Sequence, residues 1–383
     1  MNYIADSMNR IDASGIRKVF ALAASMKDPI NLSIGQPDYD VDALVKETAI
    51  AAIQDGHNAY TQTWGLDALR DACDEYYQSR FGVGLENVMV TSGVSGGLLL
   101  VLMATLNPGD EVLFADPYFV MYKHLINFLG GRAVPIDTYP EFKLTPERIE
   151  AAITPKSKLI IINSPSNPTG ISMSASELDA IAATAKKHDL LILSDEIYEG
   201  LHYDGKADTM VGRYDNLILL NGFSKLAAMT GLRVGYAAGP EDIIQAMNTL
   251  QQYTFVCAPS IAQHAAVTAL KIDHTAKVNA YREKRDLAYN LLKENFDVQK
   301  PNGAFYIFPK APDHFRESDN REGDAPAEPG PNGEAFVAEA IKNNVLIIPG
   351  SVFSEKNTHF RISFAAKNET IRRGIETISG LLD

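Results

Sequence analysis

Lys225 is the residue of this 383-residue chain whose surroundings most favour covalent chemistry. It follows the apolar run LILLNGF (217–223), and small and apolar residues follow it in KLAAMTGLRVGY (225–236). A lysine that loses solvation in such surroundings can act as an amine nucleophile. Arg233 follows in the same segment and can hold a phosphate. Taken alone, such a lysine is more often a surface residue with a buried stem, so other motifs must support this interpretation.

Asp195 ends a second apolar run, LLILSD (190–195), within the segment SDEIY (194–198). Burying an acid is costly unless it meets a positive partner. A helix cap or a solvated loop acid is the alternative at this position. The residue is therefore a candidate for pairing with a cationic ligand.

Two loops after apolar runs complete the set of candidate motifs. In NSPSNPTG (163–170), prolines on both sides restrict the backbone, so Asn167 is expected to project from a rigid turn, although a plain strand-to-helix turn is the simpler explanation. TSGVSGG (91–97) can bring backbone N–H groups close to an anion at the start of a helix. It lacks the lysine of a P-loop, and no GxGxxG supports dinucleotide binding.

The elements that must position these motifs are short apolar runs that alternate with helical patterns between residues 88 and 239. Such runs suit strands covered on both faces, and their alternation predicts a mostly parallel sheet flanked by helices. Helices are expected over 98–106 and 175–188, the second capped by Ser174 or Ser176. The expected strands are 88–91, 111–115, 133–136, 158–163, 190–195, 217–223 and 234–239.

The C-terminal part predicts a smaller α/β unit. Its expected strands are 304–309, 345–349 and 360–365, and a helix is expected near 367–382. The acidic, Pro- and Gly-rich segment 317–334 is expected to be a mobile loop. At the other end of the chain, residues 12–26 are a possible helix and 31–40 an extended segment. We expect a large domain over 41–289 and a small domain formed by 1–40 and 290–383.

Composition excludes several classes of protein. The chain is 46% hydrophobic and 22% charged, as in ordinary globular proteins, and its net charge is −13. Without a basic run, nucleic acid and anionic membranes are not expected as partners. No apolar stretch suits a membrane span or a signal peptide. Cys73 and Cys257 form neither a metal-binding spacing nor a disulfide framework, so no metal and a cytoplasmic location are expected.

The chain resembles the fold-type I pyridoxal-phosphate enzymes, in the class I/II aminotransferase branch. The resemblance covers nearly the whole chain in the expected order. GFSK followed by GLRVGY, together with NPTG and DEIY at their separations, is its most specific part. It is supported by NLSIGQPDYD, AYTQTWG, ADPYFVMY, GAFYIFP, PGSVFS and FRISFA.

The resemblance implies a role for each matched residue. Lys225 would hold the cofactor as a Schiff base and move the proton, Asp195 would pair with the pyridine nitrogen, and Arg361 with Gly35 would bind the substrate α-carboxylate. The other implied cofactor-binding residues are Tyr198 and Asn167 at the phenolic oxygen, Phe119 stacked on the ring, Ser224, Arg233 and the backbone of Val94 and Ser95 at the phosphate, and Tyr60 reaching the phosphate from a neighbouring subunit.

Three positions depart from the pattern of many relatives. Gly222 replaces a serine, which removes one phosphate hydroxyl. Val94 stands where smaller or polar residues are frequent, and Trp64 stands where a small residue is frequent, so Trp64 is expected to narrow the substrate entrance. No arginine is evident for a second, distal carboxylate of the substrate.

The resemblance implies an aminotransferase that moves the amino group of an L-amino acid to a 2-oxo acid in a ping-pong cycle, as a homodimer with composite active sites. A C–S lyase or another enzyme of the same fold shares these motifs and remains an alternative. A non-catalytic cofactor-binding regulator is a second alternative. It is less favoured, because Lys225 and Asp195 are both present and no residues remain for a DNA-binding module.

Overall fold

The computed structural model describes residues 3–13, 15, 16, 19, 22, 24, 26–315 and 332–382. The helix expected over 12–26 falls on a stretch that is described only in part, so it stays a prediction. The loop expected over 317–334 lies outside the described residues as far as residue 331. From there Asn332 caps a helix, because its side chain accepts a hydrogen bond from the backbone N–H of Ala335 at 2.9 Å.

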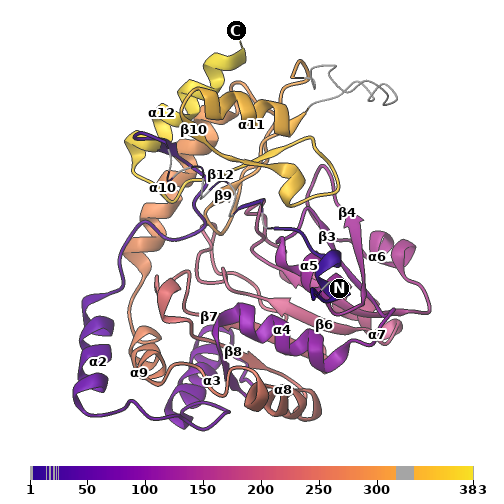
Figure 1. Cartoon of the computed structure of the whole chain (residues 1–383), viewed down its shortest axis with the longest axis vertical. Coiled ribbons are helices and arrows are strands. Elements are labelled where there is room, and N and C mark those ends of the chain that lie inside the picture. Colours follow the sequence, from indigo (N-terminus) through magenta and orange to yellow (C-terminus); the bar gives the residue numbers. More distant parts are fainter. Residues whose placement is uncertain are drawn as a thin grey trace.

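A seven-stranded sheet forms the centre of the larger, lower part of the molecule (Figure 1). Every strand predicted between residues 88 and 239 is present in it. Only β8 runs antiparallel to its neighbours, so the prediction of a mostly parallel sheet is confirmed. In spatial order the strands are β2 (Met89–Thr91), β8 (Gly235–Ala238), β7 (Leu217–Gly222), β6 (Leu191–Asp195), β5 (Ser157–Asn163), β3 (Glu111–Asp116) and β4 (Arg132–Asp137).

Successive residues of these strands face opposite sides of the sheet, and helices cover both sides. Leu159 and Ile161 of β5 join a core with helices α4 (Gly93–Thr105), α5 (Met121–Phe128) and α8 (Glu241–Tyr253). Ile160 and Ile162 join a core with α6 (Pro146–Ala152) and α7 (Ala175–Lys187) on the other side. This double burial explains why the strands are apolar throughout.

The two helices predicted within this region differ in how well their boundaries were placed. The helix over 175–188 is confirmed as α7, and the carboxylate of Glu177 accepts a hydrogen bond from the backbone N–H of the N-cap Ser174 at 2.8 Å. The prediction that a helix begins at residue 98 is wrong, because α4 begins at Gly93. The three glycines of 91–97 suggested a loop. In the helix the absence of a side chain allows close packing on the sheet, because a Cβ at Gly97 would lie 2.8 Å from the side chain of Leu220 in β7.

The C-terminal segments form the smaller, upper part of the molecule (Figure 1). Their strands are β9 (Tyr306–Ile307), β11 (Ile348–Pro349) and β12 (Phe360–Ser363) in one antiparallel sheet, with β10 (Val345–Leu346) beside it. Helices α11 (Gly333–Lys342) and α12 (Asn368–Ser379) complete it. The strands and α12 confirm the predictions, whereas α11 was not predicted.

The N-terminal segment joins this C-terminal part. β1 (Ile30–Asn31) pairs in parallel with β10, and Leu32 is fully buried in a core with Phe336 and Ile375. Among the remaining helices, α2 packs on α9, and α10 packs on α12. These helices are α2 (Ala43–Gln54), α3 (Asp67–Phe81), α9 (Ser260–Ala269) and α10 (Thr275–Leu292). The domains expected over 41–289 and over 1–40 with 290–383 stay a prediction. No helix among the described residues is both long and apolar enough to cross a membrane.

Candidate active site

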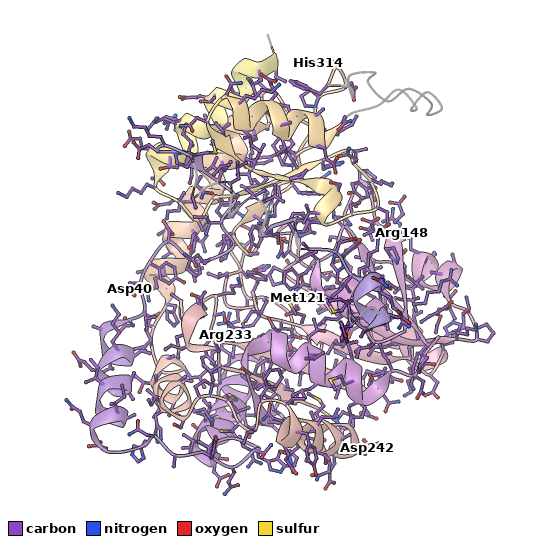
Figure 2. The ribbon with its side chains drawn as sticks, viewed as in Figure 1. Asp40, Met121, Arg148, Arg233, Asp242 and His314 are labelled. Carbon is purple, nitrogen blue, oxygen red and sulfur yellow. The ribbon has the colours of Figure 1, made fainter. Side chains whose placement is uncertain are left out.

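A cavity of about 650 Å³ lies beyond the carboxyl ends of the central strands, where the N-terminal segment and β12 approach the sheet. Ligands of parallel sheets bind at this edge. Figure 2 shows two of the lining residues, Met121 and Arg233, between the large sheet and the C-terminal part. The lining contains every predicted site residue except Tyr60: Gly35, Val94, Ser95, Phe119, Asn167, Asp195, Tyr198, Ser224, Lys225, Arg233 and Arg361.

Lys225 lies in the loop that follows β7, and both its amine and its backbone are held by the N-terminal segment. Its Nζ donates a hydrogen bond to the carbonyl of Gly35 at 2.7 Å. The hydroxyl of Tyr39 donates to the carbonyl of the next residue, Leu226, at 2.7 Å. The Lys225 amine also lies 5.5 Å from the ring centroid of Tyr198. The amine therefore faces the cavity from a fixed loop.

Asp195 is the last residue of β6 and is only 4% exposed. Its Oδ2 accepts a hydrogen bond from the Tyr122 hydroxyl at 2.6 Å, and its Oδ1 accepts a longer one from the backbone N–H of Ile197 at 3.3 Å. Burial raises the pKa of this carboxyl group, while these donors and the charge of Lys225 act in the opposite direction. In the described part of the chain no lysine or arginine lies within ion-pair distance of Asp195. A cationic ligand in the cavity would supply the missing charge.

Arg361 is a buried arginine that has no carboxylate partner among the described residues. It extends from β12, is 1% exposed, and donates hydrogen bonds to Asn167 Oδ1 at 3.0 Å and to the carbonyl of Ser33 at 2.9 Å. Its Nε is buried and has no hydrogen-bond partner in the part of the chain that the structure describes. Its guanidinium lies 4.4 Å from the ring centroid of Tyr306. Burial lowers its pKa, although arginine stays charged. An anion entering the cavity would therefore meet a charge that nothing in the described residues offsets.

The N-terminus of α4 and Arg233 lie side by side in the wall of the cavity. A side chain at Gly93 would lie 2.7 Å from Nη2 of Arg233, so the guanidinium lies against the first turn of the helix. Arg233 itself has a left-handed backbone, with φ of 54°, and donates from Nη1 to the carbonyl of Thr230. Ser224 also lines the cavity. Free helix N–H groups, an arginine and a hydroxyl are the groups that hold a phosphate.

Gly222 has a packing reason to replace the serine of many relatives. It pairs with Gly235 across β7 and β8, and a Cβ at Gly222 would lie 2.9 Å from the Cα of Gly235. A side chain at Gly235 would in turn lie 2.8 Å from the backbone N of Val94. The paired glycines therefore allow the first turn of α4 to approach the sheet.

Three residues that hold the site together were not predicted from the sequence. Tyr122 binds Asp195, and Asn163 donates a hydrogen bond to the Asp195 carbonyl at 2.9 Å. The Tyr306 hydroxyl lies 3.0 Å from the Tyr198 hydroxyl, and burial raises the pKa of Tyr198. All three lie within motifs quoted for the resemblance: Tyr122 in ADPYFVMY, Asn163 in NSPSNPTG and Tyr306 in GAFYIFP.

Tyr60 and Trp64 lie outside the cavity lining. Tyr60 is 83% exposed, so it does not contribute to the cavity of its own chain, and its expected action across a subunit boundary is untested. Trp64 was expected to narrow the entrance, but it is not among the residues that line the cavity of this chain. It packs instead against the core, with the Arg70 guanidinium 5.6 Å from its ring centroid.

The fold and the cavity are those of an α/β enzyme whose site combines a lysine amine, a buried carboxylate and two arginines. The family model for aminotransferase class I and II matches residues 27–378. This chain belongs to the class I and II aminotransferases.

Similar proteins cover the chain from end to end. The putative aminotransferase YugH of Bacillus subtilis is 37% identical over 98% of this chain and 97% of its own length. The probable aspartate aminotransferase of Methanocaldococcus jannaschii is 36% identical over 99% of this chain and all of its own length. Among solved structures, the aspartate aminotransferase from Thermus thermophilus with maleate has a TM-score of 0.90 at 32% identity, and each chain covers 100% of the other.

Proposed function

We propose that this aminotransferase moves the amino group of an L-amino acid to a 2-oxo acid with pyridoxal 5′-phosphate as its cofactor. The single observation that carries the proposal is the convergence, in one cavity, of Lys225, the buried Asp195 and the unpaired Arg361. Each residue supplies a charge or a nucleophile that this reaction requires. Among the described residues, neither Asp195 nor Arg361 has an opposite charge within ion-pair distance.

The residues present fit this cofactor. Asp195 would bind a protonated ring nitrogen, which supplies the positive partner that a buried carboxylate requires. Ser224, Arg233 and the N–H groups of Val94 and Ser95 would hold the phosphate. Phe119 would lie against the ring, and Asn167 and Tyr198 line the region expected for its phenolic oxygen. Lys225 would bind the aldehyde carbon covalently.

When bound, pyridoxal phosphate supplies an electron sink for the negative charge that develops at the substrate Cα. The chain supplies orientation and proton transfer. Arg361 would bind the substrate α-carboxylate bidentately, which fixes the direction of the Cα–H bond. Once the substrate amine has displaced Lys225 from the aldehyde carbon, the freed Nζ would remove that proton as a general base and later return it as a general acid. Asp195 would keep the ring nitrogen protonated.

The amino donor and acceptor are not assigned, because the names of the relatives differ in substrate. They include aspartate, aromatic-amino-acid and N-acetyl-LL-diaminopimelate aminotransferases. A panel of amino acids, each mixed with holoenzyme in the absence of an oxo acid, would test the reaction class. An aminotransferase should release one 2-oxo acid per site and stop until a second oxo acid is added. Continuous release of ammonia or sulfide would favour the lyase alternative.

We also propose a homodimer in which Tyr60 of each chain completes the site of the other. Support comes from side chains that are exposed in the chain: Tyr60 is 83% exposed, Tyr253 84% and Val256 41%. Aromatic side chains such as those of tyrosine are enriched at interfaces between protein chains. Isologous dimers are the commonest assembly of soluble enzymes.

A further inference from the structure

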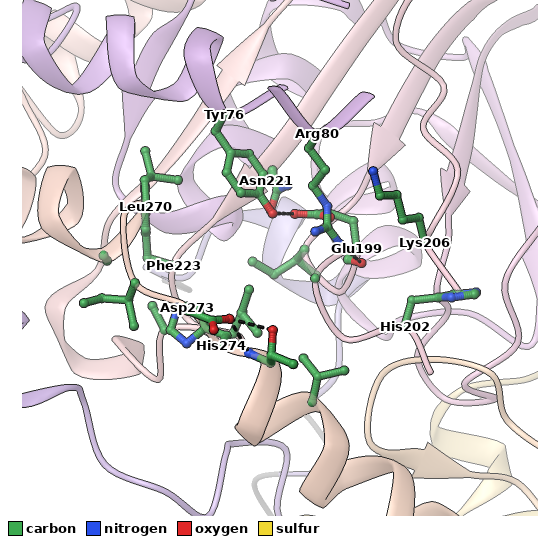
Figure 3. A pocket seen from close by; sticks show the side chains of 18 of the residues that line it. Tyr76, Arg80, Glu199, His202, Lys206, Asn221, Phe223, Leu270, Asp273 and His274 are labelled. Atoms are coloured by element: carbon green, nitrogen blue, oxygen red, sulfur yellow. Dashed lines mark hydrogen bonds and ion pairs between the residues drawn. The ribbon is translucent and has the colours of Figure 1, made fainter. Parts of the chain in front are cut away.

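A second cavity, of about 330 Å³, lies on the other side of the loop that carries Lys225 (Figure 3). Ser224 and Lys225 line the first cavity, whereas Phe223, Leu226 and Ala227 line the second. Ile197 is the one residue that lines both. The loop is therefore a wall between two separate spaces, and none of the roles described above uses the second.

One side of the second cavity is apolar and the other is cationic. Figure 3 shows Phe223 and Leu270 opposite Arg80 and Lys206. The space exceeds that needed for a few waters and falls within the range of small-molecule sites. A ligand that fits it must therefore have an apolar body and a polar end.

Arg80 is held in place by an ion pair with Glu199 that uses only part of its guanidinium group. Its Nε donates to Glu199 Oε2 at 2.8 Å, and the other carboxylate oxygen of Glu199 accepts a hydrogen bond from the Tyr76 hydroxyl at 2.5 Å. Glu199 is 4% exposed, and burial raises its pKa. Nη1 of Arg80 has no hydrogen-bond partner in the described ranges. One edge of the guanidinium is thus held in place, and the other is available.

The remaining charges of the second cavity favour an anion. The side chains of Lys206 and Arg282 take part in no hydrogen bond or ion pair among the described residues. Asp273 is the other acid of the lining, and its Oδ1 already accepts two hydrogen bonds from Thr275. Burial and the charge of Lys277 lower the pKa of His274 to about 4, so its ring adds no positive charge near pH 7. The 18-residue helix α10 also starts here, with no acid in its first turn.

We propose that the second cavity is an effector site for a small organic carboxylate with an apolar body. The carboxylate is bound by Arg80, Lys206 and Arg282, and the apolar body lies against Phe223 and Leu226. Because these two residues flank Ser224 and Lys225 in the same loop, an occupant restricts the loop that presents the catalytic amine. The ligand changes the rate of the first half-reaction without entering the first cavity.

Binding to holoenzyme can be measured by calorimetry with 4-methylpentanoate, which has no amino or oxo group to react. Wild type should show two sites per chain. Arg361→Lys should remove the binding of 4-methylpentanoate in the first cavity. Asn279→Trp fills space in the second cavity, and Arg282→Gln removes one of its positive charges. Each substitution should weaken the binding of 4-methylpentanoate in the second cavity at least about tenfold, which is the effect of losing one charge-assisted contact. Glu283→Trp on the same helix and Arg372→Gln on α12 are matched controls, because neither residue lines either cavity.

Two further measurements test the charge and the coupling. 4-Methylpentylamine, of the same shape but opposite charge, should not bind the second cavity. At a saturating amino donor, where competition in the first cavity is removed, 4-methylpentanoate should change the rate of wild type by about fivefold and leave Asn279→Trp unaffected. A single site that disappears with Arg361→Lys, equal binding of the amine, or an unchanged rate at full occupancy would each overturn the proposal. Binding needs no turnover, so this outcome is independent of the assigned reaction.

Discussion

The hydroxyl of Tyr122 lies 2.6 Å from Oδ2 of Asp195, and the two residues come from helix α5 and strand β6. The hydrogen bond holds the carboxylate at the end of its strand with one oxygen occupied and the other only weakly bound. Burial alone would favour the neutral acid, so this donor helps to keep the charge that a protonated ring nitrogen requires.

Asp195→Asn should slow proton abstraction by about a thousandfold, which corresponds to roughly 4 kcal/mol of transition-state stabilisation. The amide keeps the size of the side chain but removes the charge that holds the ring nitrogen protonated. Single-turnover spectra of the first half-reaction measure the rate directly. Tyr122→Phe is the graded control and should cost less, because it removes one hydrogen bond and leaves the carboxylate. A rate for Asp195→Asn within about twofold of wild type would exclude Asp195 as the ring partner.

Lys225→Ala should abolish turnover and the visible absorption band of the covalently bound cofactor. The phosphate-binding groups at the start of α4 are unchanged, so the cofactor should still bind, but reversibly. Spectra recorded before and after gel filtration distinguish the two modes of binding. Lys367→Ala, at an exposed position before α12, is the matched lysine control. A retained band in Lys225→Ala would assign the covalent bond to another residue.

Arg361→Lys should reduce kcat/KM for amino acids by about a hundredfold, or ~2.7 kcal/mol, because a lysine cannot reproduce bidentate carboxylate binding. Cofactor content should stay unchanged, since Arg361 lies apart from the phosphate-binding end. The comparison substrate is the decarboxylated amine of the same amino acid. If wild type uses the amine and the amino acid at equal rates, Arg361 has a different role.

Mixed dimers test whether Tyr60 acts across the subunit boundary. Lys225→Ala and Tyr60→Ala chains should each form weakly active or inactive homodimers. In a heterodimer of the two, one site has an intact Lys225 together with an intact Tyr60 from the other chain, so activity should return. If Tyr60 acted within its own chain, neither site would be intact. Sedimentation of wild type at the assay concentration provides the independent check that the active species is a dimer.

Glu196 provides a pH-dependent contribution to stability. It is buried, and burial raises its pKa from 4.5 to about 7. Because the folded state binds the proton more tightly than the unfolded state, this group stabilises the fold most below pH about 4.5, and the contribution is lost as pH rises to about 7. Denaturant unfolding of wild type and Glu196→Gln at several pH values should show a difference in the free energy of unfolding that changes across this window and is constant above it. A difference that is independent of pH would contradict the shifted pKa.

Local sequence patterns predicted the strands well but not the contacts between distant segments. The seven apolar runs of the large sheet could be recognised because strands covered on both faces have few polar residues. The start of α4 could not, because its glycines are common in loops and their use here depends on the partner strand at Gly235. Tyr306 and Tyr198 meet only because β9 and the segment after β6 are brought together by the fold, so no spacing in the chain predicts their pairing.

The pairing of β1 with β10 has a consequence for the order in which the protein is made. Residues 30 and 31 leave the ribosome early, but their partners at 345 and 346 are synthesised more than 300 residues later. The large sheet can assemble during translation before β10 and β12 are made, because its last strand, β8, ends at Ala238. The segment that carries Gly35 must wait for β10 and β12. A nascent chain can therefore contain a folded sheet with Lys225 and Asp195 while it still lacks Arg361, so the arginine proposed to bind the substrate carboxylate joins the site only after β12 is made.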